Sequence, residues 1–286
     1  MLILPAATRH RLIWKRTLHI PAAPAGIAKP MGNWKLTLAY DGTTFHGWQV
    51  QPGLQTVQGH LQAAIARITG ESLLPQGSGR TDSGVHALAQ VASFQLQAPI
   101  PAENLARALN RTLPPAIRVL SALPAPDSFH ARHGATAKTY EYRIFRGELC
   151  SPFLAPYVHP CRWPLNMDLL HQAAAQVLGE HDFLSLAASD ADLQSRSEEA
   201  EPRSTIRSIF SSSWAEESGD LLLYRVRGNG FLHHMVRNLV GTMLEIARGQ
   251  FPPGSMAAIL AARSRSAAGP TAPAKGLFLH SVEYGE

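Results

Sequence analysis

The fold of this 286-residue chain is most constrained by an order of local patterns that occurs twice. In the first half, strand-like alternation of apolar and polar residues covers 34–42, 89–96 and 116–125, and helical periodicity covers 56–70 and 101–113. The second half repeats this plan, with strand patterns over 137–145, 204–217, 220–231 and 276–285 and helical patterns over 166–183 and 233–250. Two α+β halves of similar plan predict a duplicated architecture with a cleft between the halves.

The boundary between the halves is expected in the proline- and alanine-rich segment 123–135. This boundary gives an N-terminal half at 33–130 and a C-terminal half at 131–286. The polar stretch 189–203 predicts a surface loop or a disordered insertion in the second half.

Charge and composition narrow the class of protein. The formal net charge is +5, which fits a polyanionic partner about as well as a merely basic surface. Residues 1–32 form a basic extension without acidic side chains, which resembles an organelle transit peptide, although the orderly patterns after Met31 favour translation starting there. Cys150 and Cys161 form neither a disulfide framework nor a CxxC pair, so we expect a reduced, cytoplasmic setting. No apolar run of about eighteen residues occurs, so no membrane span is expected.

The stretch GSGRTDSGVHA, residues 77–87, places one carboxylate in a run of glycines. Arg80 and Thr81 offer hydrogen-bond donors beside Asp82, and the glycines allow a ligand to approach the backbone closely. The alternative is an Asx turn in which Asp82 only accepts hydrogen bonds from nearby amides. Asp82 and His86 are also candidates for a metal site, but one such pair supplies too few ligands.

Two further segments combine aromatic and cationic side chains. Phe45 and Trp48, in YDGTTFHGWQ, are either stacking platforms for nucleobases or caps on the core. The strand pattern 137–145 places Lys138 and Tyr140 on one face, where they suit a phosphate and a base. The alternative for this strand is an ordinary half-buried position in a sheet.

The segment GNGFLHHMVRNLVG, residues 228–241, places two adjacent histidines and an arginine at the head of a helix. Spacings of three and four residues put Arg237 beside both His233 and His234. The histidines suggest zinc, but no second ligand pair follows them. A buried arginine needs a carboxylate, and Asp82 is the partner that we expect. At about 4 Å and an effective dielectric near 20 their attraction is about 4 kcal/mol before desolvation, which would keep Asp82 ionised near neutral pH.

Taken together, these stretches resemble the tRNA pseudouridine synthase A family. The resemblance rests on five segments that occur in the family's order between about Trp34 and Tyr284: YDGTTFHGWQ, GSGRTDSGVHA, FHARHGATAKTYEYRI, FLHHMVRNLVGTMLE and TAPAKGLFL. It implies the pseudouridine synthase fold, in which two similar ferredoxin-like halves share a long, mostly antiparallel central sheet with flanking helices around a cleft. It also implies an isomerase, a homodimer, and a tRNA substrate whose uridines at positions 38, 39 and 40 of the anticodon stem-loop become pseudouridine.

The same resemblance implies roles for individual residues, with the catalytic half at 33–130. Asp82 takes the catalytic position as nucleophile or general base, Arg237 pairs with it, and Tyr140 stacks on the flipped base and assists proton removal from C5. The residues expected to contact RNA are Arg80, Thr81, His86, Phe45, Trp48, Gln49, Arg132, Lys138, His233 and His234. Because substrate and product are isomers of one redox state, we expect no cofactor and no metal.

Two rival functions remain open at this point. A tRNA-binding module or RNA chaperone would use the same basic cleft without catalysis, and would bind tRNA without releasing tritium from 5-tritiated uridine. A metal-dependent hydrolase built on Asp82, His86 and His233 would lose its activity in EDTA.

Overall fold

The computed structural model describes residues 32–188, 204–217 and 220–285. Nearly all of the N-terminal extension and the whole insertion 189–203 lie outside the described residues, so the expectations for both stay predictions. The described residues belong to one compact unit, Met31–Glu286. The division of this unit into two halves near residue 130 also stays a prediction.

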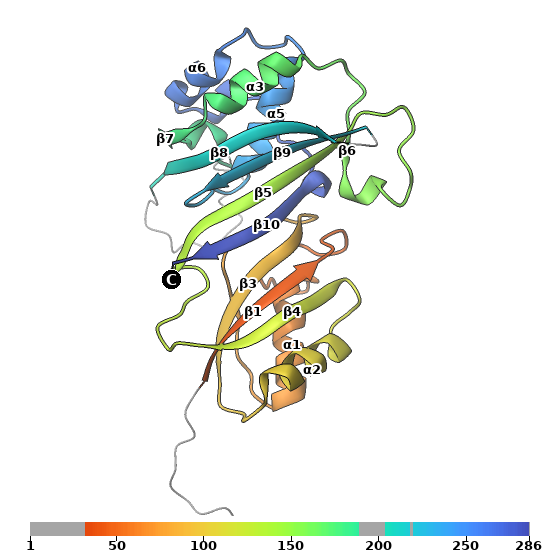
Figure 1. Ribbon diagram of the computed structural model, residues 1–286, viewed down its shortest axis with the longest axis vertical. Helices are drawn as coiled ribbons and strands as arrows, with labels where there is room; N and C mark the ends of the chain where they lie inside the picture. The colour runs from red at the N-terminus through yellow and green to blue at the C-terminus, as the bar shows by residue number, and fades with distance from the viewer. Residues whose placement is uncertain (1–31, 189–203, 218–219, 286) are drawn as a thin grey trace, which may run out of the picture. The chain divides into compact units, whose positions relative to one another are not determined.

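One long sheet organises the described part of the chain (Figure 1). Its main strands follow the order β4-β1-β3-β10-β5-β9-β8-β7, and two short strands, β2 and β6, pair with β3 and β5. Neighbouring strands are antiparallel except that β10 is parallel to β3 and β6 is parallel to β5. The bounds are β1 Gly32–Tyr40, β2 Gln76–Gly77, β3 His86–Leu96, β4 Ile117–Ala125, β5 Ala135–Phe145, β6 His159–Pro160, β7 Gly179–Asp182, β8 Ile206–Glu217, β9 Leu221–Gly228 and β10 Leu277–Tyr284. The predicted α+β fold with a largely antiparallel central sheet is confirmed.

The last strand of the chain joins the strands of the first half to those of the second. β10 lies parallel to β3, where Phe278 is opposite His86. On its other side β10 is antiparallel to β5, where Leu279 is opposite Tyr140. One strand, β10, therefore separates β3, which begins shortly after Asp82, from β5, which carries Tyr140.

Local sequence sets the ends of helix α1, Val57–Thr69. Thr56 is its N-cap, and the side-chain oxygen of Thr56 accepts a hydrogen bond from the Gly59 amide at 3.3 Å. Gly70 ends the helix at a φ of 77°, a left-handed conformation that glycine adopts without strain. Both ends agree with the helical pattern of the sequence.

The other helices flank the sheet in two groups (Figure 1). Helix α2, Ala102–Thr112, packs on β4 and α1, while α3, Met167–Ala175, packs on β8 and α5. Helices α5 and α6 span Met235–Ala247 and Ser255–Ala262, and α6 was not among the helices expected from sequence patterns. The helix predicted over 166–183 is wrong beyond Ala175, because Gly179 turns the chain at a φ of 91° and the next residues pair with β8 as β7.

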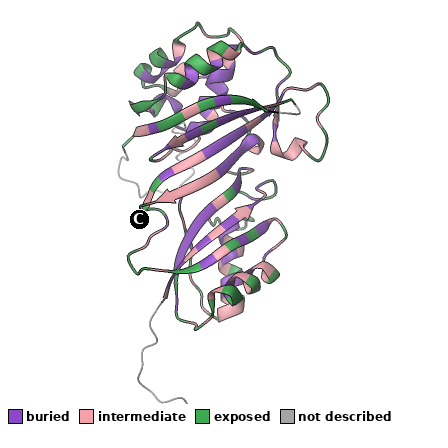
Figure 2. Cartoon of the chain, viewed as in Figure 1, coloured by how far each residue is buried: buried purple, intermediate pink, exposed green. Residues whose placement is uncertain are grey.

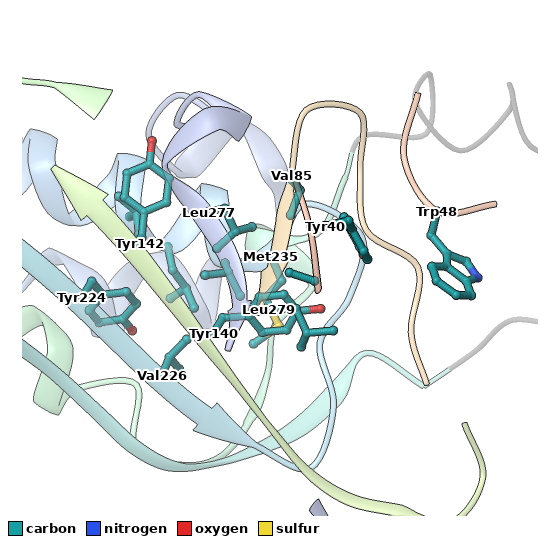
Figure 3. Packing of buried hydrophobic residues seen from close by; sticks show 14 of the residues in the cluster. Tyr40, Trp48, Val85, Tyr140, Tyr142, Tyr224, Val226, Met235, Leu277 and Leu279 are labelled. Carbon is teal, nitrogen blue, oxygen red and sulfur yellow. The ribbon is translucent and has the colours of Figure 1, made fainter. Parts of the chain in front are cut away.

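Buried side chains concentrate along the central strands (Figure 2). Tyr142 of β5 and Tyr224 of β9 are both 0% exposed and lie in this core (Figure 3). Met235, the first residue of α5, lies beside Leu279 and Tyr140 in the same cluster (Figure 3). The head of α5 is thereby anchored at the middle of the sheet. Among the described helices, none has the length and apolar character that crossing a bilayer requires.

Candidate active site

The loop that carries Asp82 is held in place by a buried glutamine and a lysine. Ser78 donates its hydroxyl to Gln90 Oε1 at 2.6 Å, and Gln90 Nε2 donates to the Gly79 carbonyl at 3.0 Å. Lys138 Nζ, on β5, donates to the Ser78 carbonyl at 2.6 Å. Gln90 is 0% exposed, so water does not reach its side-chain amide, and hydrogen bonds to the loop satisfy the amide instead. The strands β3 and β5 thus fix the start of the Asp82 loop.

A second loop, residues 41–48, packs against the other side of the Asp82 loop. The Trp48 amide donates to the Thr81 carbonyl at 3.1 Å, and the Gly84 amide donates to the Phe45 carbonyl at 3.2 Å. Gly47 has a φ of 84°, and a Cβ on it would lie only 2.5 Å from the Thr81 carbonyl oxygen. Only glycine allows the two loops to approach this closely.

The glycines around Asp82 make room for contacts within the chain, and the expectation that they also admit a ligand stays a prediction. A Cβ on Gly77 would lie 2.5 Å from the Trp48 indole, and one on Gly79 would lie 3.3 Å from Lys138 Nζ. Gly84 has a φ of 77°, which disfavours a side chain whatever the space around it. The glycines therefore shape the loop, and the loop positions the carboxylate.

Three basic side chains from the head of α5 surround the Asp82 carboxylate. His233 Nε2 lies 3.1 Å from Oδ1, while His234 Nε2 and Arg237 Nη1 lie 3.6 Å and 3.4 Å from Oδ2. His234 reaches the carboxylate from a left-handed backbone conformation, with a φ of 61°, at the N-cap of the helix. The Asp82 side chain is 14% exposed and the Arg237 side chain 16%, so the group is largely buried but open to a ligand. The predicted ion pair between Asp82 and Arg237 is confirmed.

The surroundings keep the Asp82 carboxyl ionised. Burial raises the pKa of Asp82, but the hydrogen-bonding contact with His233 and the electrostatic attraction of His233, His234 and Arg237 together outweigh burial, so this pKa lies below its ordinary value. Arg237 is itself oriented, because its Nε donates to the Ala272 carbonyl at 2.7 Å. The site therefore presents a negative oxygen in a position set by several partners.

Tyr140 lies in the core next to this group. Its side chain is 8% exposed, and its ring meets the Phe231 ring edge to face with centroids 5.0 Å apart. Burial, then the nearby Tyr40 and Asp82, raises the pKa of Tyr140 well above its ordinary range. The phenol is therefore protonated near neutral pH, which favours the stacking role over proton removal from C5.

His86 lies away from the Asp82 carboxylate and is 1% exposed. Its Nδ1 accepts a hydrogen bond from the Gly42 amide at 3.0 Å, and its ring stacks on Phe278 with centroids 4.6 Å apart. Burial lowers the pKa of His86, so the ring is neutral near pH 7. The expectation that His86 contacts RNA is corrected, and so is its pairing with Asp82 as metal ligands, because the side chain instead links β3 to neighbouring loops.

The remaining predicted RNA contacts divide by exposure. Phe45 is 5% exposed, Trp48 1% and Thr81 4%, so these three belong to the core, and direct contact with RNA is not available to them. Arg80 and Arg132 are exposed, and Gln49, Lys138, His233 and His234 are partly exposed. Sequence reasoning missed the buried Gln90, whose position in a strand gave no local sign of its four partners, Ser78, Gly79, Tyr40 and Val91.

A family model described as tRNA pseudouridine synthase matches residues 37–133 and 173–285, more than half of the chain. The matched segments contain Asp82 and Arg237, whereas Tyr140 lies between them. The fold, the ionised carboxylate and this match together define the class of protein, a synthase that isomerises uridine within RNA.

Curated relatives narrow the class further. The chain is 53% identical over 250 residues to the tRNA pseudouridine synthase A of Solibacter usitatus, with 87% of this chain and 98% of the relative covered. It is 43% identical to the enzymes of the same name from Bordetella petrii, over 89% of this chain and 92% of the relative, and Moorella thermoacetica, over 87% and 98%. The chain belongs to the tRNA pseudouridine synthase family and isomerises uridine in tRNA.

These relatives are all named for the enzyme, so the alternative of a tRNA-binding module without catalysis gains no support. Among solved structures, the chain has a TM-score of 0.32 and 14% identity to the archaeal box H/ACA sRNP Nop10–Cbf5 complex, over 79% of this chain and 47% of that chain. A similarity of this size adds nothing to the family assignment.

Proposed function

We propose that the enzyme converts uridine to pseudouridine at positions 38, 39 and 40 of the tRNA anticodon stem-loop, with Asp82 as its catalytic residue. The observation that carries this proposal is the meeting of Asp82 with His233, His234 and Arg237 beside Tyr140, at distances of 3.1 to 3.6 Å for the three basic groups. An ionised carboxylate that is 14% exposed fits a reaction at a ribose that reaches it from solvent.

The reaction breaks an N-glycosidic bond, turns the uracil, and joins its C5 to the same sugar carbon. Asp82 has three routes to this result, namely attack on C1′, addition to C6 of the base, or removal of the 2′-proton to give a glycal. A covalent route would divide one difficult step into two easier ones. All three routes need the ionised carboxylate that the lowered pKa of Asp82 supplies. None of them requires an external cofactor, because no electrons enter or leave.

A uridine in a stem must leave the base stack before Asp82 reaches its sugar, at a cost of a few kcal/mol. Stacking of the base on Tyr140 would return about 1–3 kcal/mol. Phe231 already meets the edge of the Tyr140 ring, so these two rings form an apolar surface next to the carboxylate. Because Phe231 is partly exposed, a base would reach Tyr140 by displacing or joining it.

The basic side chains around the site are proposed to bind the RNA backbone. Arg80 and Arg132 are exposed, and Lys138 Nζ contacts the Asp82 loop at the Ser78 carbonyl. Desolvation, and then the nearby charges of Arg132 and Arg207, lowers the pKa of Lys138 to about 8, so these cations lie close enough to repel one another. A phosphate would relieve this repulsion, and the binding should weaken steeply with salt.

A homodimer and a cytoplasmic location complete the proposal. The loop after β5 carries Leu149 and Phe153, which are 86% and 89% exposed, and such side chains favour burial by a second copy. Substitution of both by serine should produce monomers in analytical ultracentrifugation, whereas serine at Leu120, which is 58% exposed on β4, should leave the dimer intact. The free Cys150 and Cys161 suit a reducing compartment.

Release of tritium from tRNA labelled at C5 of uridine tests the catalytic role of Asp82. Asp82→Asn should abolish release while tRNA affinity changes only a few fold, because the amide keeps the shape and loses the charge. Asp127→Asn is the matched control, since Asp127 is exposed and lies in the linker. Substantial pseudouridine formation by Asp82→Asn would contradict the assignment. Mapping of pseudouridine in tRNA from cells that lack the gene would identify the positions modified.

A further inference from the structure

We propose that Asp82, His233 and His234 form a Zn²⁺ site, and that zinc bound there blocks the carboxylate needed for catalysis. One carboxylate oxygen and one nitrogen of each imidazole in this group all lie within 4.8 Å of one another. The inhibitory effect rests on the proposed catalytic role of Asp82, whereas the binding of the ion does not.

The distances fit a tetrahedral ion. Zinc bonds to imidazole nitrogen and carboxylate oxygen are about 2.1 Å long, so two tetrahedral ligand atoms lie about 3.4 Å apart. His233 Nε2 is 3.1 Å from one Asp82 oxygen, and His234 Nε2 is 3.6 Å from the other. The two imidazole rings are tilted by 34° with centroids 3.8 Å apart. Because two imidazoles on one tetrahedral ion have centroids about 5 Å apart, the rings must turn away from each other to hold the ion, whereas their distances to the carboxylate already suit it.

His233 supplies a second observation that points to a ligand. Both of its ring nitrogens are buried and lack a hydrogen-bond partner of good geometry among the described residues, although Nε2 faces Asp82 Oδ1 at 3.1 Å. Coordination would give Nε2 a directed bond in addition to this ion-pair contact.

The same surroundings weaken zinc binding, so the ion acts as a reversible inhibitor and not as a permanently bound cofactor. Arg237 Nη1 lies 3.4 Å from Asp82 Oδ2 and repels a cation there. Histidines at permanent sites usually donate their other ring nitrogen to a partner that orients them, and Nδ1 of His233 has none among the described residues. Zinc and the substrate ribose would compete for the same Asp82 oxygens.

Titration of the purified protein with Co²⁺, which gives strong visible absorption at tetrahedral sites, tests the binding without any tRNA. We expect one saturable Co²⁺ per chain, displaced by Zn²⁺. His233→Gln and Asp82→Asn should each weaken binding by about 100-fold or more, since even the loss of a group that only orients a ligand costs about 10–100-fold. The matched control removes His130 and His133, a second close pair whose ring centroids are 4.3 Å apart, and should leave the absorption unchanged.

Loss of the absorption in the His130→Gln/His133→Gln variant, or its persistence in both His233→Gln and Asp82→Asn, would overturn the site. Thermal unfolding of each variant shows whether it is folded. In the activity assay, Zn²⁺ should inhibit tritium release and EDTA should restore it, and full activity at saturating Zn²⁺ would refute the block. A chain that binds Co²⁺ as expected but releases no tritium under any condition would uphold the metal site and refute the proposed function.

Discussion

Substitution of Gly47 by alanine tests whether the contact between the 41–48 loop and the Asp82 loop sets the position of the catalytic carboxylate. Gly47 has a φ of 84°, and its added Cβ would lie 2.5 Å from the Thr81 carbonyl oxygen and 3.1 Å from the Asp82 carbonyl carbon. To reach an ordinary contact of 3.4 Å, the Thr81 carbonyl must move by about 0.9 Å. Thr81 directly precedes Asp82, so the carboxylate must move with it.

Gly53 provides a matched control for the backbone strain. It has a φ of 73°, and a Cβ on it would meet nothing within 4 Å. Gly53→Ala should therefore cost only the strain of a left-handed alanine, about 1–2 kcal/mol. Gly47→Ala adds an overpacking cost of about 1–3 kcal/mol. The total for Gly47→Ala is then about 2–5 kcal/mol of the free energy of unfolding.

Urea unfolding and the kcat for tritium release measure the two consequences separately. A misplacement of about 1 Å at a reacting group lowers the rate by about 100-fold, so the kcat of Gly47→Ala should fall by that order. The kcat of Gly53→Ala should stay near that of the wild type. Equal losses of stability in the two variants, or a kcat for Gly47→Ala within twofold of the control, would refute the idea that this contact positions Asp82.

Three further outcomes follow from other contacts. His86 has a lowered pKa, so the folded state binds a proton at this ring less readily than the unfolded state does. The stability that the neutral ring contributes is therefore present above about pH 6.5 and is lost as the pH falls through the lowered pKa. The urea midpoint of His86→Gln should decline less on acidification than that of the wild type. Gln90→Leu leaves its buried partners without hydrogen bonds and should lower the free energy of unfolding in urea by about 2–4 kcal/mol. Gln95→Leu, at an exposed position of the same strand, should change it by no more than about 0.5 kcal/mol, and similar losses in the two variants would refute the role of Gln90. Arg237→Leu removes a guanidinium 3.4 Å from Asp82, an attraction of about 5 kcal/mol before desolvation. The variant should lose kcat at least 100-fold and also some thermal stability, because Asp82 loses a partner in a largely buried site; wild-type turnover would show that the ion pair is dispensable.

Local patterns were sufficient for most elements and for the location of the candidate site. The Thr56 cap and Gly70 set the ends of α1, and alternation of apolar and polar residues gave the main strands. The same reasoning failed over 166–183, because the periodicity of α3 runs on into β7, where pairing with β8 decides the conformation. Pairing with a strand far along the chain leaves no mark in the periodicity of the segment itself.

At the site, the exposure of side chains was the property least predictable from local sequence. Phe45 and Trp48 stand in one segment of mixed polarity and His86 in another, and both stacking on RNA and packing in the core favour such residues. Gly77 explains why Trp48 is buried, because the indole occupies the space that a side chain at position 77 would fill. This packing brings together two residues that are 29 positions apart, so the local sequence around Trp48 or around Gly77 does not predict it.

The order of the main strands and helices, the glycine-rich loop around Asp82 and the family of the protein were determined by the sequence itself, because each depends on neighbouring residues or on short motifs. Tertiary structure decided that His233 and His234 join the predicted partner Arg237 around the carboxylate. Asp82 and Arg237 are 155 residues apart, and they meet because β10 inserts between β3 and β5 while Met235 anchors the head of α5 beside it. The lowered pKa of Asp82 and the hydrogen bonds of the site arise from that long-range packing.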